Sequence, residues 1–190
     1  MPPPPAAPAP AGAPAILAIS GSLRRTSVNT AALRAAVTAA AAAGVAATLD
    51  DAVRSLPHFD PDLEAAPPDA VARFDAACRE AAGVLISVPE YAHGIPGAFK
   101  NALDWTVGTG SLYAKPVAVL DVAAPTRGGY VRAALDHVLQ AMQADVVHYA
   151  VPVAAADRGA DGEITGEAVL AALRGVVTDF AARIGRHVTV

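Results

Sequence analysis

The sequence is poor in cysteine and in charged residues, and each shortage excludes a class of protein. Cys78 is the only cysteine among 190 residues, so no disulfide can form within the chain and a disulfide-stapled secreted fold is excluded. Charged residues make up 17% of the chain and the net charge is −4, whereas nucleic-acid binding needs a positive field. We therefore expect no nucleic acid and no membrane as a partner.

Long hydrophobic runs are missing as well. No apolar stretch approaches membrane-spanning length without a glycine, a proline or a charge. The first charged residue is Arg24, so the basic segment that opens a signal peptide is absent. These absences predict a cytoplasmic protein.

The composition divides the chain into two parts. Residues 1–14 are almost wholly proline and alanine, a low-complexity composition that cannot bury a core, and we expect a disordered leader there. Residues 15–190 have the length of one domain. Because 54% of the chain is hydrophobic, this part is expected to form a single globular domain.

Strand and helix patterns alternate from residue 15 onwards. Short apolar runs predict strands at residues 15–20, 45–49, 83–88, 116–122 and 146–151. Apolar residues at helical spacing predict helices at residues 29–43, 69–82, 96–106, 131–142 and 165–184. This alternation indicates right-handed crossovers and an open parallel sheet with helices on both faces.

The number of strands suggests where a ligand binds. For a doubly wound sheet of five parallel strands we expect the flavodoxin-like order 2-1-3-4-5, in which the switch point lies between the first and third strands. Ligands of such sheets bind at the carboxyl ends of the strands beside the switch point. The site is therefore expected on the loops that follow Ser20 and Val88.

The loop after the first strand has the chemistry of a phosphate site. It reads GSLRRTSVN over residues 21–29 and runs directly into a predicted helix. Hydroxyls, an amide, guanidinium groups and free backbone N–H groups together suit a terminal phosphate. The alternative is an ordinary helix start, with Ser27 or Asn29 as the N-cap and solvated arginines. The motifs G-x-G-x-x-G and G-x-x-x-x-G-K-[ST] are both absent, which leaves a mononucleotide as the expected ligand.

The loop after the third strand reads PEYAHGIPG over residues 89–97 and continues as AFKNALDW. With the first loop it resembles the GSLRxxSxN and PEYNxxxPGxLKNAIDW signatures of NAD(P)H-dependent FMN reductases, a flavodoxin-like family that includes quinone, chromate and azo-dye reductases. The resemblance extends from Ile16 to about Met142. It implies FMN as the cofactor and NAD(P)H as a substrate.

The resemblance also implies site residues. The FMN phosphate would be held by Ser22, Arg24, Ser27 and Asn29 with the backbone of Val28. The ribityl chain and the isoalloxazine would be lined, largely through main-chain groups, by Pro89, Glu90, Tyr91 and Ala92. A weaker match over residues 123–129 adds Ala124.

The chain departs from the family pattern at two of these positions. Ala92 stands where the family usually has asparagine, and Ala124 stands where a small polar residue is common. Both changes remove side-chain hydrogen bonds, so contacts to the flavin there would come from the backbone.

Other chemistry-bearing residues are interpreted structurally. A stripe of charged and aromatic side chains follows the second loop and is expected to fix its helix to that loop, or to a neighbouring subunit, and not to react; it comprises Lys100, Asn101, Asp104 and Trp105. Cys78 lies on an apolar helix face and is expected in the core. The five histidines lack metal-ligand spacing, so no metal is expected. His93 either donates to a substrate oxygen or is an exposed loop residue.

The resemblance implies an enzyme in which the flavin performs the chemistry, so no catalytic side chain is expected. Hydride would pass from NAD(P)H through FMN to a quinone, a flavin or a similar small acceptor by a ping-pong mechanism. The family also suggests a homodimer or homotetramer. The alternative is a non-enzymatic FMN electron carrier or a flavin-dependent regulatory module. Arg24, Arg25 and the moderate net charge favour the enzyme, since flavodoxins have an arginine-free phosphate loop and are usually strongly acidic.

Overall fold

The computed structural model describes residues 16–188, in which five parallel strands pair in the order β2-β1-β3-β4-β5. The strands are β1 (Ile16–Ser20), β2 (Ala47–Asp50), β3 (Gly83–Ser87), β4 (Pro116–Asp121) and β5 (Asp145–Ala150). The α-helices are α1 (Val28–Ala42), α2 (Asp69–Glu80), α3 (Gly97–Val107), α4 (Gly129–Ala141) and α5 (Glu167–Val188). The predicted flavodoxin-like fold and strand order are confirmed. The predicted leader at residues 1–14 lies outside the described residues.

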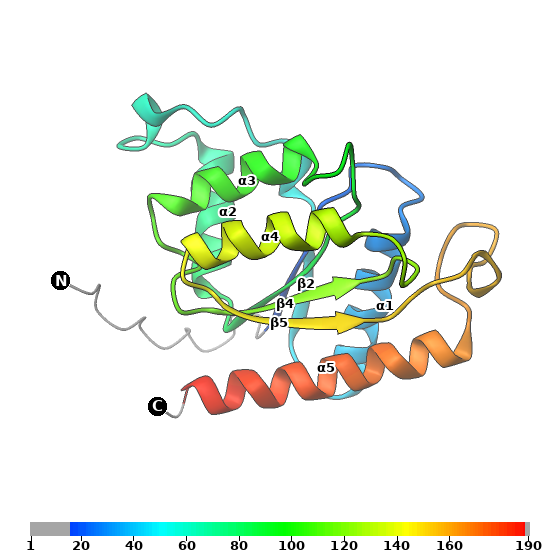
Figure 1. The fold of residues 1–190 in the computed structure, drawn as a ribbon. Helices are drawn as coiled ribbons and strands as arrows, with labels where there is room; N and C mark the ends of the chain where they lie inside the picture. Colours follow the sequence, from blue (N-terminus) through cyan, green and yellow to red (C-terminus); the bar gives the residue numbers. More distant parts are fainter. Residues whose placement is uncertain (1–15, 189–190) are drawn as a thin grey trace.

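Helices cover both faces of the sheet, as expected from the alternating pattern. One layer consists of α1 and α5, and the other of α2, α3 and α4 (Figure 1). A hydrophobic core lies on each face of the sheet, and successive side chains of β1 point alternately into the two cores. Ile16 and Ala18 pack under α1 and α5, while Leu17 and Ile19 pack under the opposite helix layer. No helix between residues 16 and 188 has the length and hydrophobicity needed to cross a bilayer.

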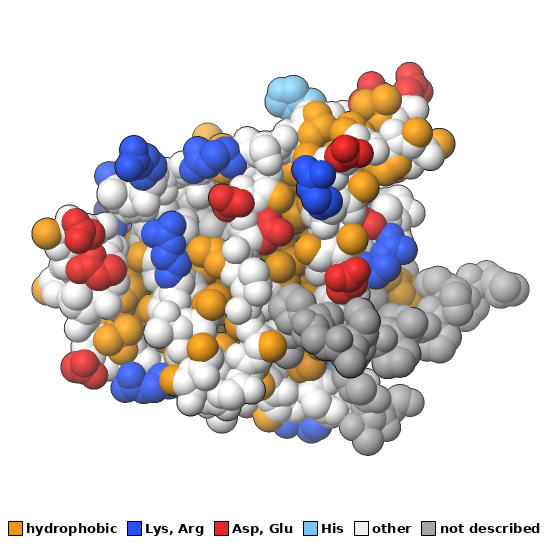
Figure 2. Space-filling model, turned by 180° about the vertical axis from the view of Figure 1, so that it is seen from behind, with side chains coloured by type: hydrophobic (Ala, Val, Ile, Leu, Met, Phe, Trp, Pro, Cys, Tyr) orange, Lys and Arg blue, Asp and Glu red, His pale blue; other side chains and the backbone are white. Residues whose placement is uncertain are grey.

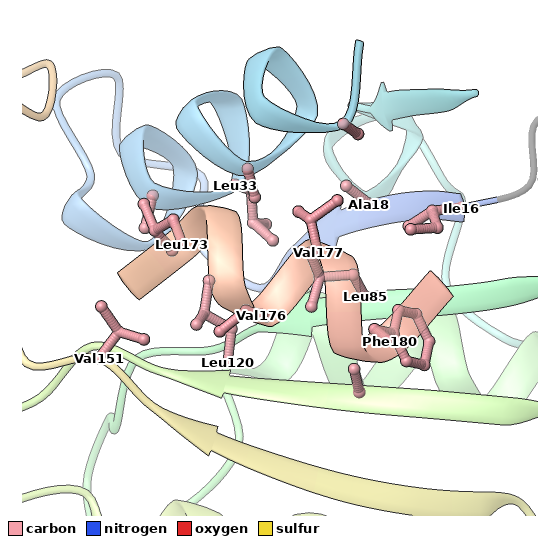
Figure 3. Close-up of a cluster of buried hydrophobic side chains, with 14 of the residues drawn as sticks. Ile16, Ala18, Leu33, Leu85, Leu120, Val151, Leu173, Val176, Val177 and Phe180 are labelled. Carbon is pink, nitrogen blue, oxygen red and sulfur yellow. The ribbon is translucent and has the colours of Figure 1, made fainter. Parts of the chain in front are cut away.

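The core under α1 and α5 is closed by large side chains from the two helices. Leu33 of α1 and Phe180 of α5 are both fully buried and lie over Leu85 at the centre of the sheet (Figure 3). Deleting one such side chain costs about 2–5 kcal/mol, since the cavity left behind adds to the lost transfer free energy. This packing holds the amino-terminal end of α1 in place above β1.

Most element boundaries differ from the prediction by one to four residues, and two of these differences have identifiable reasons. The second strand begins at Ala47 rather than at residue 45, because Val45 closes the end of α1. Its N–H donates to Ala40 O at 2.9 Å, after Gly44 in the left-handed region at φ 72°, which is a Schellman motif. Helix α4 begins at Gly129 rather than at residue 131, because its first amides are capped by a carboxylate from another loop, described below.

The long connection between β2 and α2 contains two short 3-10 helices, Ala52–Arg54 and Pro61–Leu63. Helix α3 fastens this connection to the domain. Asn101 accepts from the N–H of Phe59 at 2.7 Å and donates to Pro57 O at 2.9 Å, and Trp105 Nε1 donates to the same carbonyl at 2.9 Å. Asn101 and Trp105 are thus structural, as expected, but they fix α3 to the connection between β2 and α2 and not to the loop after the third strand.

Candidate functional site

The carboxyl ends of β1 and β3 lie side by side, at the predicted switch point. The two strands pair from Ile16 with Gly83 to Ser20 with Ser87, and the N–H of Gly21 donates to Ser87 O at 2.9 Å. A Cβ atom at Gly21 would lie 2.7 Å from Val88 Cγ1, closer than carbon atoms pack. Only glycine allows this approach, which brings the two predicted ligand loops together.

Hydroxyl groups shape the loop between β1 and α1. Ser27 is the N-cap of α1 and accepts from the N–H of Thr30 at 3.4 Å, so the structural interpretation of Ser27 is confirmed. Ser22 Oγ accepts from the N–H of Arg24 at 3.3 Å. Among residues 16–188 neither hydroxyl donates a hydrogen bond, and both serine residues are buried. Each O–H therefore stays available to an anion.

The amino-terminal end of α1 offers further donors. The N–H groups of Val28 and Asn29 have no acceptor among the described residues, and the first turn contains no acidic side chain. The guanidinium groups of Arg24 and Arg25 are exposed and also have no partner within residues 16–188. Free amides, the positive end of the helix dipole and two unpaired cations form a donor set that fits a phosphate.

Asn29 connects the loop to the sheet. Its Oδ1 accepts from Ser87 Oγ at 2.9 Å, and the same hydroxyl lies 2.8 Å from Leu120 O. Asn29 and Ser87 are both buried, so these bonds fix the orientation of the Asn29 amide. Its Nδ2 has no partner in the described part of the chain and is left as a donor toward the loop.

Two arginines that sequence reasoning missed hold the loop in shape. Arg54 donates to Leu23 O at 2.5 Å, and Arg158 donates to Thr26 O at 2.8 Å. Both lie far from the loop in sequence, and neither belongs to a motif. They satisfy backbone carbonyls and leave Arg24 and Arg25 free.

The loop after β3 presents its backbone and directs its acidic side chain elsewhere. Glu90 Oε2 accepts from the N–H of Tyr130 at 3.0 Å and from that of Val131 at 3.2 Å. Glu90 therefore caps α4, where a carboxylate also complements the helix dipole. With its carboxylate engaged at α4, Glu90 has only its main chain left for the predicted flavin contact, which stays a prediction.

A tight turn follows at the tip of this loop. Tyr91 and Gly94 exchange backbone hydrogen bonds of 3.1 and 3.0 Å, and the two central residues, Ala92 and His93, have φ angles of 48° and 59°. Two left-handed residues are what a type I′ turn requires. Asparagine tolerates this conformation better than alanine does, so the backbone alone gives a reason for the asparagine common in the family at position 92.

Aromatic side chains stand at the rim beside the turn. Tyr91 is 51% exposed, and its side chain is accessible to a ligand. His93 packs edge-on against Tyr130, with ring centroids 4.3 Å apart, and its Nδ1 lies 3.7 Å from Glu90 Oε1. His93 is thus an exposed loop residue with defined neighbours.

The third predicted loop follows β4. Asp121 accepts from the N–H of Ala123 at 3.0 Å and forms an ion pair with Arg132. Ala124 is exposed, and its carbonyl accepts from the N–H of Arg127 at 2.8 Å. Within residues 16–188 no group of three or more potential metal ligands occurs.

Comparisons with known proteins relate the chain to flavin reductases. NAD(P)H-dependent FMN reductase from Pseudomonas aeruginosa is 37% identical over 112 residues, which are 57% of this chain and 60% of the relative. NADPH:quinone oxidoreductase from Arabidopsis thaliana is 35% identical over 119 residues, which are 60% of each protein. The chain thus spans about three fifths of the length of these curated relatives.

Solved structures extend the similarity over most of the chain. FerB, a flavoenzyme NAD(P)H:(acceptor) oxidoreductase from Paracoccus denitrificans, superimposes with a TM-score of 0.72 at 30% identity, covering 90% of this chain and 97% of FerB. An archaeal flavodoxin has a TM-score of 0.60 at 9% identity and shows the fold alone. The family model for NADPH-dependent FMN reductase matches residues 14–158. The chain therefore belongs to the NADPH-dependent FMN reductase family, as its two loop motifs predicted.

Proposed function

We propose that this protein binds FMN at the carboxyl ends of β1 and β3 and uses it to pass reducing equivalents from NAD(P)H to a small acceptor. The observation that carries the proposal is the donor set at the amino-terminal end of α1. Its free amides, serine hydroxyls and unpaired guanidinium groups lie at the switch point of the sheet, where nucleotides bind in this fold.

Each part of the site has a role in this proposal. The phosphate is held by Ser22, Arg24, Ser27 and Asn29 together with the N–H of Val28. The ribityl chain and the ring lie along the backbone of residues 89–92, with Ala124 on the neighbouring loop. The bound flavin supplies the hydride chemistry. The protein orients it and leaves one side open beside Tyr91.

If one side of the bound flavin stays open, as we propose, the two substrates alternate there. NAD(P)H and the acceptor would occupy the same space in turn, which is a ping-pong mechanism. A quinone is the acceptor class we favour, since relatives carry names such as NADPH:quinone oxidoreductase, and a flavin is the second choice. We also propose a cytoplasmic location and a homodimer or homotetramer, following the family.

Purification followed by spectroscopy and kinetics tests the proposal. The protein should show a flavin spectrum between about 350 and 500 nm that bleaches when NAD(P)H is added without oxygen. Steady-state assays with NAD(P)H and a benzoquinone should give parallel double-reciprocal lines. If FMN binds but NAD(P)H is oxidised no faster than with free FMN, the electron-carrier alternative is correct. If FMN does not bind, both are wrong.

A further inference from the structure

A cavity of about 520 Å³ lies between α1 and residues 161–174, and the loop before α1 lines one end of it. Its floor is apolar and consists of Ala31, Ala35, Ala39, Ala42, Ile164 and Leu170. The volume lies within the range of small-molecule sites, which are mostly apolar with a few placed polar groups.

Hydrogen bonds build the end wall of this cavity before any ligand arrives. Residues 158–164 form a hairpin in which the N–H of Gly159 donates to Glu163 O at 3.0 Å. Arg158 fixes this hairpin to the α1 loop through Thr26 O at 2.8 Å. The cavity is therefore a preformed feature rather than a gap between mobile segments.

Three unpaired cations surround the apolar floor. Arg25, Arg34 and Arg174 line the cavity, and within residues 16–188 none of their guanidinium groups has a hydrogen-bond or ion-pair partner. Asp161 and Glu163 also line it, but Glu163 folds back against Gly159 of its own hairpin. The rear face of the molecule shows both basic and acidic side chains, scattered among hydrophobic and uncharged surface (Figure 2).

We propose that this cavity is a second binding site, for a small amphipathic anion such as an aromatic carboxylate or sulfonate. The apolar body of the ligand lies on the alanine floor, where α1 has no large side chains to exclude it. The anionic group meets guanidinium groups, which offer paired hydrogen bonds to two oxygen atoms of an oxyanion. The site adjoins the proposed phosphate site, because Arg25, Thr26 and Ser27 of the loop before α1 also line the cavity. The two sites extend in different directions, since the floor alanines Ala31, Ala35 and Ala39 pack in the core with α5 whereas Asn29 contacts Ser87 of β3.

Calorimetric titration of naphthalene-2-sulfonate into FMN-saturated protein tests the proposal, since bound FMN occupies the proposed site at the carboxyl ends of β1 and β3. One site per chain is expected. Arg34→Gln and Arg174→Gln should each weaken binding about tenfold, whereas Arg73→Gln, on α2 in the opposite helix layer, should leave it unchanged. The neutral analogue naphthalene-2-methanol should bind at least about tenfold more weakly than the sulfonate.

A filled-cavity variant provides an independent check. Ala35→Leu should abolish probe binding while the FMN content and the circular dichroism spectrum stay unchanged. The proposal is overturned if the probe does not bind, if the neutral analogue binds equally well, or if the Arg34 and Arg174 variants bind like Arg73→Gln. A second copy of the chain covering the cavity would give the first of these results.

Discussion

Three residues of the predicted phosphate site use one hydrogen-bonding group within the protein and leave a donor unpaired among the described residues: Ser22, Ser27 and Asn29. Both serine hydroxyls accept backbone N–H groups, and Asn29 Oδ1 accepts from Ser87. These bonds orient the remaining donors without satisfying them. The positive charge for a phosphate would come from the arginines. The family pattern assigns Arg24 to the phosphate.

Arg24→Ala should weaken FMN binding by about 1.5–3 kcal/mol, the range for a hydrogen bond to a charged group. The measurement is a titration of apoprotein with FMN. Arg24→Lys should recover only part of the loss, because an ammonium group cannot offer paired donors in a plane. Wild-type affinity in the alanine variant would show that Arg24 does not hold the phosphate.

Ala92→Asn should raise the free energy of unfolding of the apoprotein by roughly 1 kcal/mol, because Ala92 has a φ angle of 48° and asparagine tolerates the left-handed region. The same substitution should tighten FMN by about 0.5–1.5 kcal/mol if the amide also bonds the flavin. Ala92→Gly is the matched control, since it relieves the backbone without adding an amide. Equal FMN affinities for the two variants would mean that the loop contacts the flavin through its backbone alone.

Helix α4 is capped by a residue that lies 40 and 41 positions before the two amides it binds. Glu90 accepts from the N–H groups of Tyr130 and Val131, and α4 itself has no side-chain cap at Gly128. The Glu90 hydrogen bonds therefore hold the loop after β3 against the start of α4.

Glu90→Ala should lower the free energy of unfolding by about 1 kcal/mol, the usual cost of losing a helix cap. Glu90→Gln should cost less, since one amide oxygen still accepts while the favourable charge at the helix terminus is lost. Urea unfolding of both variants measures the difference. If Glu90→Gln were as destabilising as Glu90→Ala, the charge rather than the hydrogen bonds would be the main contribution.

The features that the sequence predicted correctly are those determined by short stretches of the chain. The strand order, the position of the two loops at the switch point and the N-cap at Ser27 all follow from runs, spacing and capping chemistry within a few residues. The cap that Glu90 supplies and the support from Arg54 and Arg158 join segments 31 to 132 residues apart. A single sequence contains no periodicity that reports such pairs.

At the scale of the whole molecule, the Cys78 thiol becomes able to ionise at its ordinary pKa only when the domain unfolds. It is buried in the core under α2 and α3, as the sequence predicted, and burial together with the nearby Asp75 carboxylate raises the pKa of its thiol. A thiol that ionises only after unfolding makes stability depend on pH. Stability is complete below the ordinary pKa near 9.0 and falls as the pH rises above it, because the unfolded chain then loses a proton that the folded chain keeps.

The free energy of unfolding should therefore fall by up to about 1.4 kcal/mol per pH unit above pH 9. Lys115, whose pKa burial lowers, and Tyr149, whose pKa burial raises, also contribute at higher pH. Cys78→Ala isolates the thiol, since the difference in slope between variant and wild type belongs to Cys78. Identical slopes between pH 9 and 10 would show that the thiol ionises equally well in the folded protein.

The hydrogen bond from Arg158 to Thr26 O joins residues that are 132 positions apart, and this separation has a consequence for biosynthesis. Chains emerge from the ribosome amino-terminal end first, at about 5–20 residues per second. The loop after β1 is among the first parts of the domain to be made, yet its partner arrives roughly ten seconds later at those rates. A nascent chain that ends before Arg158 contains the loop predicted to hold the phosphate but lacks the guanidinium that fixes its backbone. We therefore expect FMN to bind only at the end of synthesis or after it.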